Sequence, residues 1–138
     1  MKQAPSNPCL PNGNAPFEAF LQAYMNRKNW NQTQLAENAR LNQAYINKLC
    51  TGRLKDKSVD RLVCVCLALQ LPLEEAKDLL ARAERAFSPA SETHEAYQKL
   101  IALYAARPFD AKGKIDWMDA ADRYLEDLGF PPLPNCYD

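Results

Sequence analysis

Apolar residues recur along much of the chain at intervals of three and four, the spacing that places side chains on one face of an α-helix. The first such stripe begins directly after Pro16 and consists of Phe17, Phe20, Leu21, Tyr24 and Met25. It predicts a core-facing helix that ends near Asn29. Similar stripes or apolar runs predict helices over residues 59–70, 73–87, 92–106 and 116–128.

The residues that begin these later helices favour the same boundaries. Ser58, Ser91 and Asp116 stand where an N-cap side chain is expected. The helix after Ser58 is apolar on nearly all sides, which predicts a central, buried element. The last helix is expected to bury its own apolar residues, Leu128 included. With four glycines and few β-branched residues, the chain is expected to be all-α.

The segment 31–53 has a more specific pattern, because it predicts two short helices joined by a tight turn. Asn31 and Gln34 have the spacing of a capping box, which indicates where the first helix starts. The break falls at Arg40, Asn42 can cap the second helix, and Gly52 ends it. This outline is that of a helix-turn-helix.

The order and spacing of several residues here also resemble a known family. The positions are Gln32, Leu35, Ala36, Leu41, Ile46, Leu49, Gly52 and Arg53. They are similar to the DNA-binding domain of the Xre/Cro group of phage and bacterial repressors, over roughly residues 17–71. The resemblance implies a five-helix, lambda-repressor-like domain, here with two further helices packed on it. It also implies a homodimeric transcriptional regulator that binds double-stranded DNA. Arg40 stands at the usual turn glycine, where a left-handed conformation costs about 1–2 kcal/mol.

The second helix of the motif, over residues 42–50, is expected to enter the major groove. Its base-contacting candidates are Gln43, Ala44, Asn47 and Lys48. A glutamine amide can pair with adenine through two hydrogen bonds, and an alanine can contact a thymine methyl group. The phosphate-contacting candidates are Gln32, Arg40, Tyr45, Thr51, Arg53, Lys55 and Lys57. For Tyr45, packing against the neighbouring helix is an equally good interpretation.

The charge is unevenly distributed although its total is zero. Residues 17–57 carry seven Lys and Arg side chains against three acidic ones, a net charge of +4. Residues 73–138 carry eight basic against thirteen acidic side chains, a net charge of −5. The positive potential is thus expected around the helix-turn-helix, with the acidic half held away from phosphate.

The cysteine and histidine residues lack the spacing that a metal site or a catalytic site requires. Cys64 and Cys66 point about 200° apart on a helix and cannot share a metal ion, and the five cysteines form no Cys-x-x-Cys pair. His94 has no nucleophile in a recognisable pattern nearby, and the acids of the last helix are expected to be solvated. We therefore expect free thiols, no metal site, no cofactor and no enzymatic activity.

The predicted division of the chain is a flexible arm over 1–14, a helix-turn-helix domain over 15–88 and a helical extension over 89–138. The arm has three prolines, three asparagines and little apolar content, so it is expected to be unstructured or loosely docked. An arm that binds the minor groove would need arginines, and only Lys2 is basic. Trp30 is expected to pack as a hydrophobic staple rather than stack on a base. No membrane-spanning run or secretion signal is present, so the protein is expected in the cytoplasm.

Two functions fit these patterns. The first is a DNA-binding regulator, a dimeric repressor of a phage or mobile element, whose interface is formed by the helices at 92–128 with Phe130 and Tyr137. The alternative is a protein-binding adaptor or antitoxin-like module, in which residues 73–138 bind a protein partner. The neutral total charge and the irregular turn at Arg40 favour the alternative.

Overall fold

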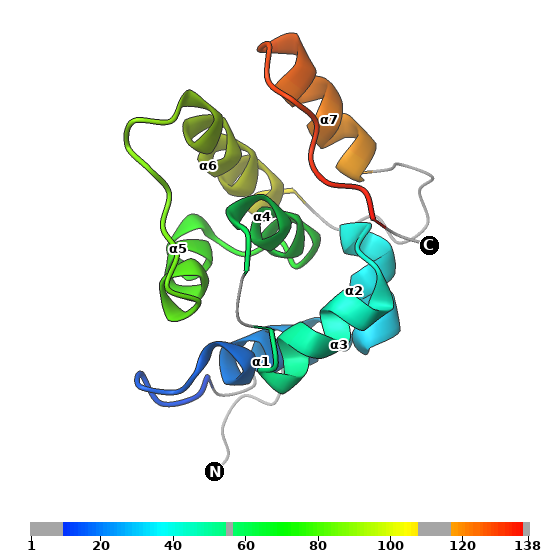
Figure 1. The fold of residues 1–138 in the computed structure, drawn as a ribbon, viewed down its shortest axis with the longest axis vertical. Helices are drawn as coiled ribbons and strands as arrows, with labels where there is room; N and C mark the ends of the chain where they lie inside the picture. The colour runs from blue at the N-terminus through cyan, green and yellow to red at the C-terminus, as the bar shows by residue number, and fades with distance from the viewer. Residues whose placement is uncertain (1–9, 55–56, 108–116, 137–138) are drawn as a thin grey trace.

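Seven α-helices make up the regular secondary structure of the described residues. The computed structural model describes residues 10–54, 57–107 and 117–136, and these ranges contain no strand. The helices are α1 (Phe17–Lys28), α2 (Gln32–Ala39), α3 (Gln43–Thr51), α4 (Val59–Ala68), α5 (Leu73–Arg82), α6 (Glu92–Ala105) and α7 (Trp117–Asp127) (Figure 1). The all-α prediction is confirmed.

Polar caps set the limits of α2 and α3, as predicted. The Asn31 side chain accepts a hydrogen bond from the Gln34 amide, and the Gln34 side chain accepts one from the Asn31 amide, each at 2.9 Å. The Asn42 side chain accepts from the Tyr45 amide at 2.9 Å, which caps α3. Gly52 ends α3 at φ 75°, a left-handed conformation that favours glycine, and an added Cβ would lie 2.6 Å from Glu18 Oε2, so the Glu18 side chain would have to move.

Helix α4 is the centre of the fold. It packs against α2, α5 and α6, and it occupies the middle of the molecule in Figure 1. Its six consecutive residues from Leu62 to Leu67 are all buried, which confirms the prediction of a central helix. Burial raises the pKa of the Cys66 thiol to about 12, and Cys50, Cys64, Cys66 and Cys136 are free thiols.

The turn between α2 and α3 is held by the C-terminal part of the chain. Arg40 has φ 55° and ψ 40°, the left-handed conformation that its position required. Its guanidinium donates to Asp119 at 2.9 Å and to Asp122 at 2.8 Å, both on α7. Its carbonyl accepts a hydrogen bond from the Cys136 amide at 2.8 Å. We call these three bonds the Arg40 clamp.

The segment after α7 packs back onto the molecule. Leu133 is buried, and its amide donates to Asp122 at 2.8 Å, so this carboxylate serves both the tail and the turn. In Figure 1 the tail runs back along α7 and reaches α2. Phe130 is half-buried against the core, and Tyr137 lies outside the described residues. The described tail therefore completes the core, a role that the sequence analysis missed.

The segment before α1 is tied to α5. Arg82 donates to the carbonyls of Gly13 at 2.7 Å and Ala15 at 2.9 Å, and its guanidinium lies 3.6 Å from the centre of the Phe20 ring. The prediction of an arm over residues 1–14 is thus tested only beyond residue 9, where the chain is docked near its junction with α1.

Three details of the predicted helices were wrong. Helix α5 ends at Arg82 instead of Phe87, because Glu84 takes a left-handed φ of 61° and the Arg85 amide bonds back to the Leu80 carbonyl at 2.9 Å. Ser58 occupies the N-cap position of α4 but its side chain makes no cap bond. Leu128 lies beyond the end of α7 and is 52% exposed.

Other expected core residues lie where they were predicted. Trp30 is half-buried against the core, with the Lys28 ammonium 5.3 Å from the ring centre. His94 accepts a hydrogen bond from the Ser88 amide at 2.9 Å and stacks on Tyr97, so it is a structural residue of α6.

None of the helices in the described part of the chain has the length and apolar character of a membrane span.

We predict that the Arg40 clamp contributes measurably to stability. Asp122→Ala removes one partner of a guanidinium that is only 11% exposed and also leaves the Leu133 amide without its acceptor. We expect a loss of about 2 kcal/mol in the free energy of unfolding, measured by urea denaturation. Asp127→Ala, on the exposed end of α7, is the control and should change it by less than about 0.5 kcal/mol. Equal effects of the two substitutions would contradict the role of the clamp.

Candidate nucleic-acid interface

One side of α3 faces solvent and carries the residues predicted to contact bases. Ile46 and Leu49 are fully buried and fix the opposite side of the helix against the core. Gln43, Ala44 and Lys48 are exposed, and we call them the α3 face. Their spacing places them near one another along the helix, so they form a short exposed surface of two polar side chains and one methyl group.

A chain of hydrogen bonds runs beside the α3 face. The Asn47 amide donates to the Gln32 side chain at 3.2 Å, which links α3 to the first residue of α2. The Asn47 side-chain carbonyl accepts from the Arg53 guanidinium at 2.9 Å. Arg53 also donates to the Thr51 hydroxyl at 3.1 Å, and that hydroxyl donates to the Asn47 backbone carbonyl at 2.9 Å. The structure therefore brings together four of the predicted contact residues.

Asn47 has a different part in this network from the one predicted. Both polar groups of its side chain are engaged within the protein, by Gln32 and Arg53. Its half-buried position beside the α3 face suits it to hold these two side chains in place. No pattern in the sequence indicates this bond, because Gln32 and Asn47 are 15 residues apart and meet only through the packing of α2 on α3.

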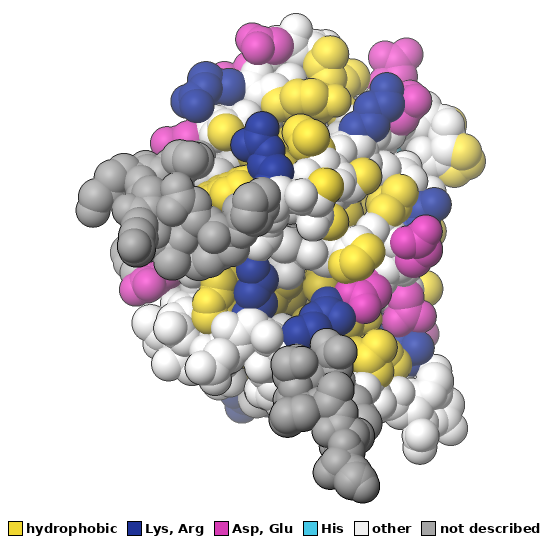
Figure 2. All heavy atoms as spheres, turned by 180° about the vertical axis from the view of Figure 1, so that it is seen from behind, with side chains coloured by type: hydrophobic (Ala, Val, Ile, Leu, Met, Phe, Trp, Pro, Cys, Tyr) yellow, Lys and Arg dark blue, Asp and Glu magenta, His cyan; other side chains and the backbone are white. Residues whose placement is uncertain are grey.

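The basic charge of the helix-turn-helix is partly neutralised by the second half of the chain. Arg27 pairs with Glu75 at 2.6 Å and Arg40 pairs with Asp119 and Asp122, so these three acidic side chains lie against the motif. Figure 2 shows basic and acidic side chains interspersed on the rear face.

The remaining basic side chains differ in how they are held. Lys28 donates to Gln70 at 2.6 Å, and burial lowers the pKa of its ammonium. Lys57 is half-buried and donates to the Leu54 carbonyl at 2.8 Å. Within the described part of residues 17–57, this leaves Lys48 and Arg53 as the exposed basic side chains that no carboxylate pairs. Lys55, a predicted phosphate contact, lies outside the described residues.

Two predicted phosphate contacts point away from this surface. The Arg40 guanidinium is bound to α7 and is nearly buried, so in this structure it is not available to a phosphate. The Tyr45 hydroxyl is buried and has no hydrogen-bond partner among the described residues. Burial raises the pKa of Tyr45 to about 12, and the Arg61 guanidinium lies 5.4 Å from its ring centre. Of its two interpretations, the geometry favours packing.

The comparisons with known proteins agree with this geometry. A family model described as helix-turn-helix matches residues 21–75, a range that begins within α1 and ends within α5. No curated protein and no solved structure matches the chain. The match supports a helix-turn-helix DNA-binding domain over residues 21–75, fits a lambda-repressor-like fold and supports a DNA-binding transcriptional regulator in general.

We predict that Tyr45→Phe leaves DNA binding intact. The substitution removes a buried hydroxyl without a partner and keeps the ring beside Arg61. The free energy of unfolding should stay equal or rise by up to about 1 kcal/mol, measured by urea denaturation, and the affinity for DNA should change less than about twofold. A tenfold loss of affinity with unchanged stability would instead assign the hydroxyl to a phosphate contact.

Proposed function

We propose that the protein is a sequence-specific DNA-binding repressor that reads the major groove with α3. The observation that carries this proposal is the exposed α3 face, flanked by the ordered side chains of Gln32, Asn47 and Arg53. Side chains that are already held in position lose less conformational entropy when they bind. The resemblance to phage and bacterial repressors supports a repressor of a phage or mobile element.

In this proposal the α3 face reads the bases. Gln43 lies in the first turn of α3, where a side chain enters the groove, and it pairs with adenine through its amide. Ala44 contacts a thymine methyl group. Lys48, one turn further along the helix, donates to guanine or to a phosphate.

The flanking network provides the phosphate contacts that orient α3 in the groove. Gln32, Thr51 and Arg53 lie on both sides of Asn47, and the Arg53 guanidinium keeps N–H groups beyond those bonded to Asn47 and Thr51. Lys55 and Lys57 remain proposed contacts, and Lys57 would first have to release the Leu54 carbonyl. Arg40 is not part of the proposed surface.

A homodimer is the second part of the proposal, because a single small module makes too few contacts for tight specific binding. Two copies would place their α3 helices in half-sites about one helical turn apart. Leu103 on α6 is 45% exposed and Leu128 after α7 is 52% exposed. These are large exposed apolar side chains in the region predicted to form the interface.

One observation favours the alternative, a protein-binding adaptor or antitoxin-like module. Glu75, Asp119 and Asp122 remove two arginines from the positive surface of the motif, which weakens the attraction for DNA. The dependence of binding affinity on salt concentration distinguishes the two functions. DNA binding through a few phosphates should weaken with a slope of about −2 to −4 in log affinity against log salt, and an apolar protein contact should not.

We predict that Gln43→Ala/Lys48→Ala abolishes selective DNA binding. A random duplex library is first enriched with the wild-type protein, and fluorescence anisotropy then compares the enriched duplex with a scrambled one. Loss of two base contacts should weaken specific binding by about 30-fold or more, because each contact contributes about 1–3 kcal/mol.

The control for this experiment is Gln22→Ala/Lys99→Ala, which removes the same two residue types from exposed positions on α1 and α6. It should bind as the wild type does. Failure of the wild-type protein to enrich any sequence would argue for the adaptor.

We predict that Leu103→Ser/Leu128→Ser shifts the protein toward monomer. Both side chains are exposed, so the fold should be retained while the apolar contact between copies is lost. Analytical ultracentrifugation at micromolar concentration, with and without the enriched duplex, measures the change. A wild-type protein that stays monomeric on DNA, or a variant that dimerises as well as the wild type, would contradict the proposed interface.

A further inference from the structure

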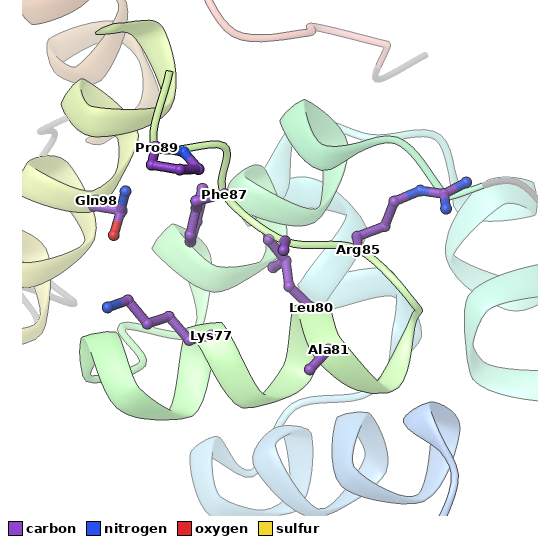
Figure 3. A pocket seen from close by; sticks show the side chains of 8 residues that line it. Lys77, Leu80, Ala81, Arg85, Phe87, Pro89 and Gln98 are labelled. Atoms are coloured by element: carbon purple, nitrogen blue, oxygen red, sulfur yellow. The ribbon is translucent and has the colours of Figure 1, made fainter. Parts of the chain in front are cut away.

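A cavity of about 350 Å³ lies between α5, the α5–α6 connection and α6, outside the DNA-binding surface (Figure 3). The volume is within the range of sites that bind small molecules. Its lining residues are Lys77, Leu80, Ala81, Arg85, Ala86, Phe87, Pro89 and Gln98.

The lining has an apolar body and a polar end. Phe87 is half-buried with its ring edge-on to His94 at 5.9 Å, and Leu80 is fully buried behind the surface of the cavity. Figure 3 shows Lys77 and Gln98 with their ends directed toward one another, beside Phe87 and Pro89. A few polar groups at one end of an apolar cavity fix the orientation of a ligand and select its chemistry.

The charge of the side chains that line the cavity favours an anionic ligand. Two of the lining side chains, Lys77 and Arg85, are cationic and none is acidic. Lys77 is exposed and makes no hydrogen bond or ion pair with any described residue. Gln98 uses one N–H on the His94 carbonyl at 3.3 Å, which leaves its second N–H and its carbonyl for a ligand.

We infer that this cavity binds a small monocarboxylate with an apolar body of aromatic or branched-aliphatic size. Its carboxylate accepts a hydrogen bond from the Lys77 ammonium, with the Gln98 amide beside it, and its body lies against Phe87 and Pro89. A charge-assisted hydrogen bond to Lys77 provides the selectivity for an anion. The small volume excludes a folded partner, and inorganic phosphate has no apolar body to contact Phe87 and Pro89.

The cavity is connected to the segment that follows α3. Arg85 lines the cavity, but Figure 3 shows its guanidinium directed away from Lys77, and its Nε donates to the Lys57 carbonyl at 2.7 Å. The neighbouring Glu84 has a left-handed φ of 61°, so the backbone is strained where the connection begins. The Arg85–Lys57 hydrogen bond therefore joins the lining of the cavity to the segment that follows α3.

The test is an NMR titration of the ¹⁵N-labelled full chain without DNA, so its outcome does not depend on the proposed function. The probes are phenylacetate and 4-methylvalerate, with phenylacetamide and inorganic phosphate as comparisons. Saturable shifts of the Leu80, Phe87 and Gln98 amides are expected with at least one carboxylate. Binding of phenylacetamide and phosphate should be at least about tenfold weaker, since each loses either the charge or the apolar body.

Lys77→Met keeps the apolar stem of the side chain and removes the ammonium, and it should weaken carboxylate binding by about tenfold or more. Lys99→Met is the matched control, because Lys99 lies on α6 outside the cavity, 3.8 Å from Glu95, and it should bind as the wild type does. The site would be overturned if neither carboxylate, up to about 10 mM, shifted the amide signals of the cavity. It would also be overturned if Lys77→Met bound the carboxylates with unchanged affinity. Chemical-shift changes at the cavity amides without any at the Lys57 and Ser58 amides would overturn the connection to the segment that follows α3.

Discussion

The conformation of the turn between α2 and α3 depends on the Arg40 clamp. An arginine with positive φ is strained by about 1–2 kcal/mol, and a nearly buried guanidinium is costly unless carboxylates pair with it. Asp119 and Asp122 provide the pairing, and the Cys136 amide satisfies the Arg40 carbonyl. The angle at which α3 leaves α2, and hence the placement of the α3 face, is set with the help of residues about 80 positions further along the chain.

The same contacts change the electrostatics of the molecule. In the sequence, the positive first part and the negative second part are separate, which suggests a different partner for each. In the fold they neutralise one another at Arg27 and Arg40, which leaves Lys48 and Arg53 as the exposed basic side chains in the described part of the motif that no carboxylate pairs. When the sequence-independent attraction for phosphate is weak, base contacts contribute a larger share of the binding free energy. The binding of two copies to one DNA site then also contributes a larger share.

Local chemistry allowed much of the fold to be predicted. The capping box of Asn31 and Gln34, the Asn42 cap and the Gly52 stop use residues within three positions of one another, so the spacing alone determined the limits of α2 and α3. The apolar stripes likewise identified the core faces of α1, α4 and α6. What could not be predicted depends on contacts distant in sequence: the pairing of Arg40 with α7, the burial of Leu133 and the Gln32–Asn47 bond. The early end of α5 at Arg82 was missed because the apolar pattern continues through Ala83 while the backbone turns at Glu84.

The distance along the chain between Arg40 and α7 also has a consequence during synthesis. Translation proceeds at about 5–20 residues per second, so the 79 residues from Arg40 to Asp119 separate their emergence by roughly 4 to 16 s. During that interval the helices of the motif have left the ribosome, but the turn between them lacks both carboxylates and the tail amide. In a nascent chain the left-handed Arg40 therefore stays unpaired at first, and the Arg40 clamp is complete only once α7 and the tail up to Cys136 have been made.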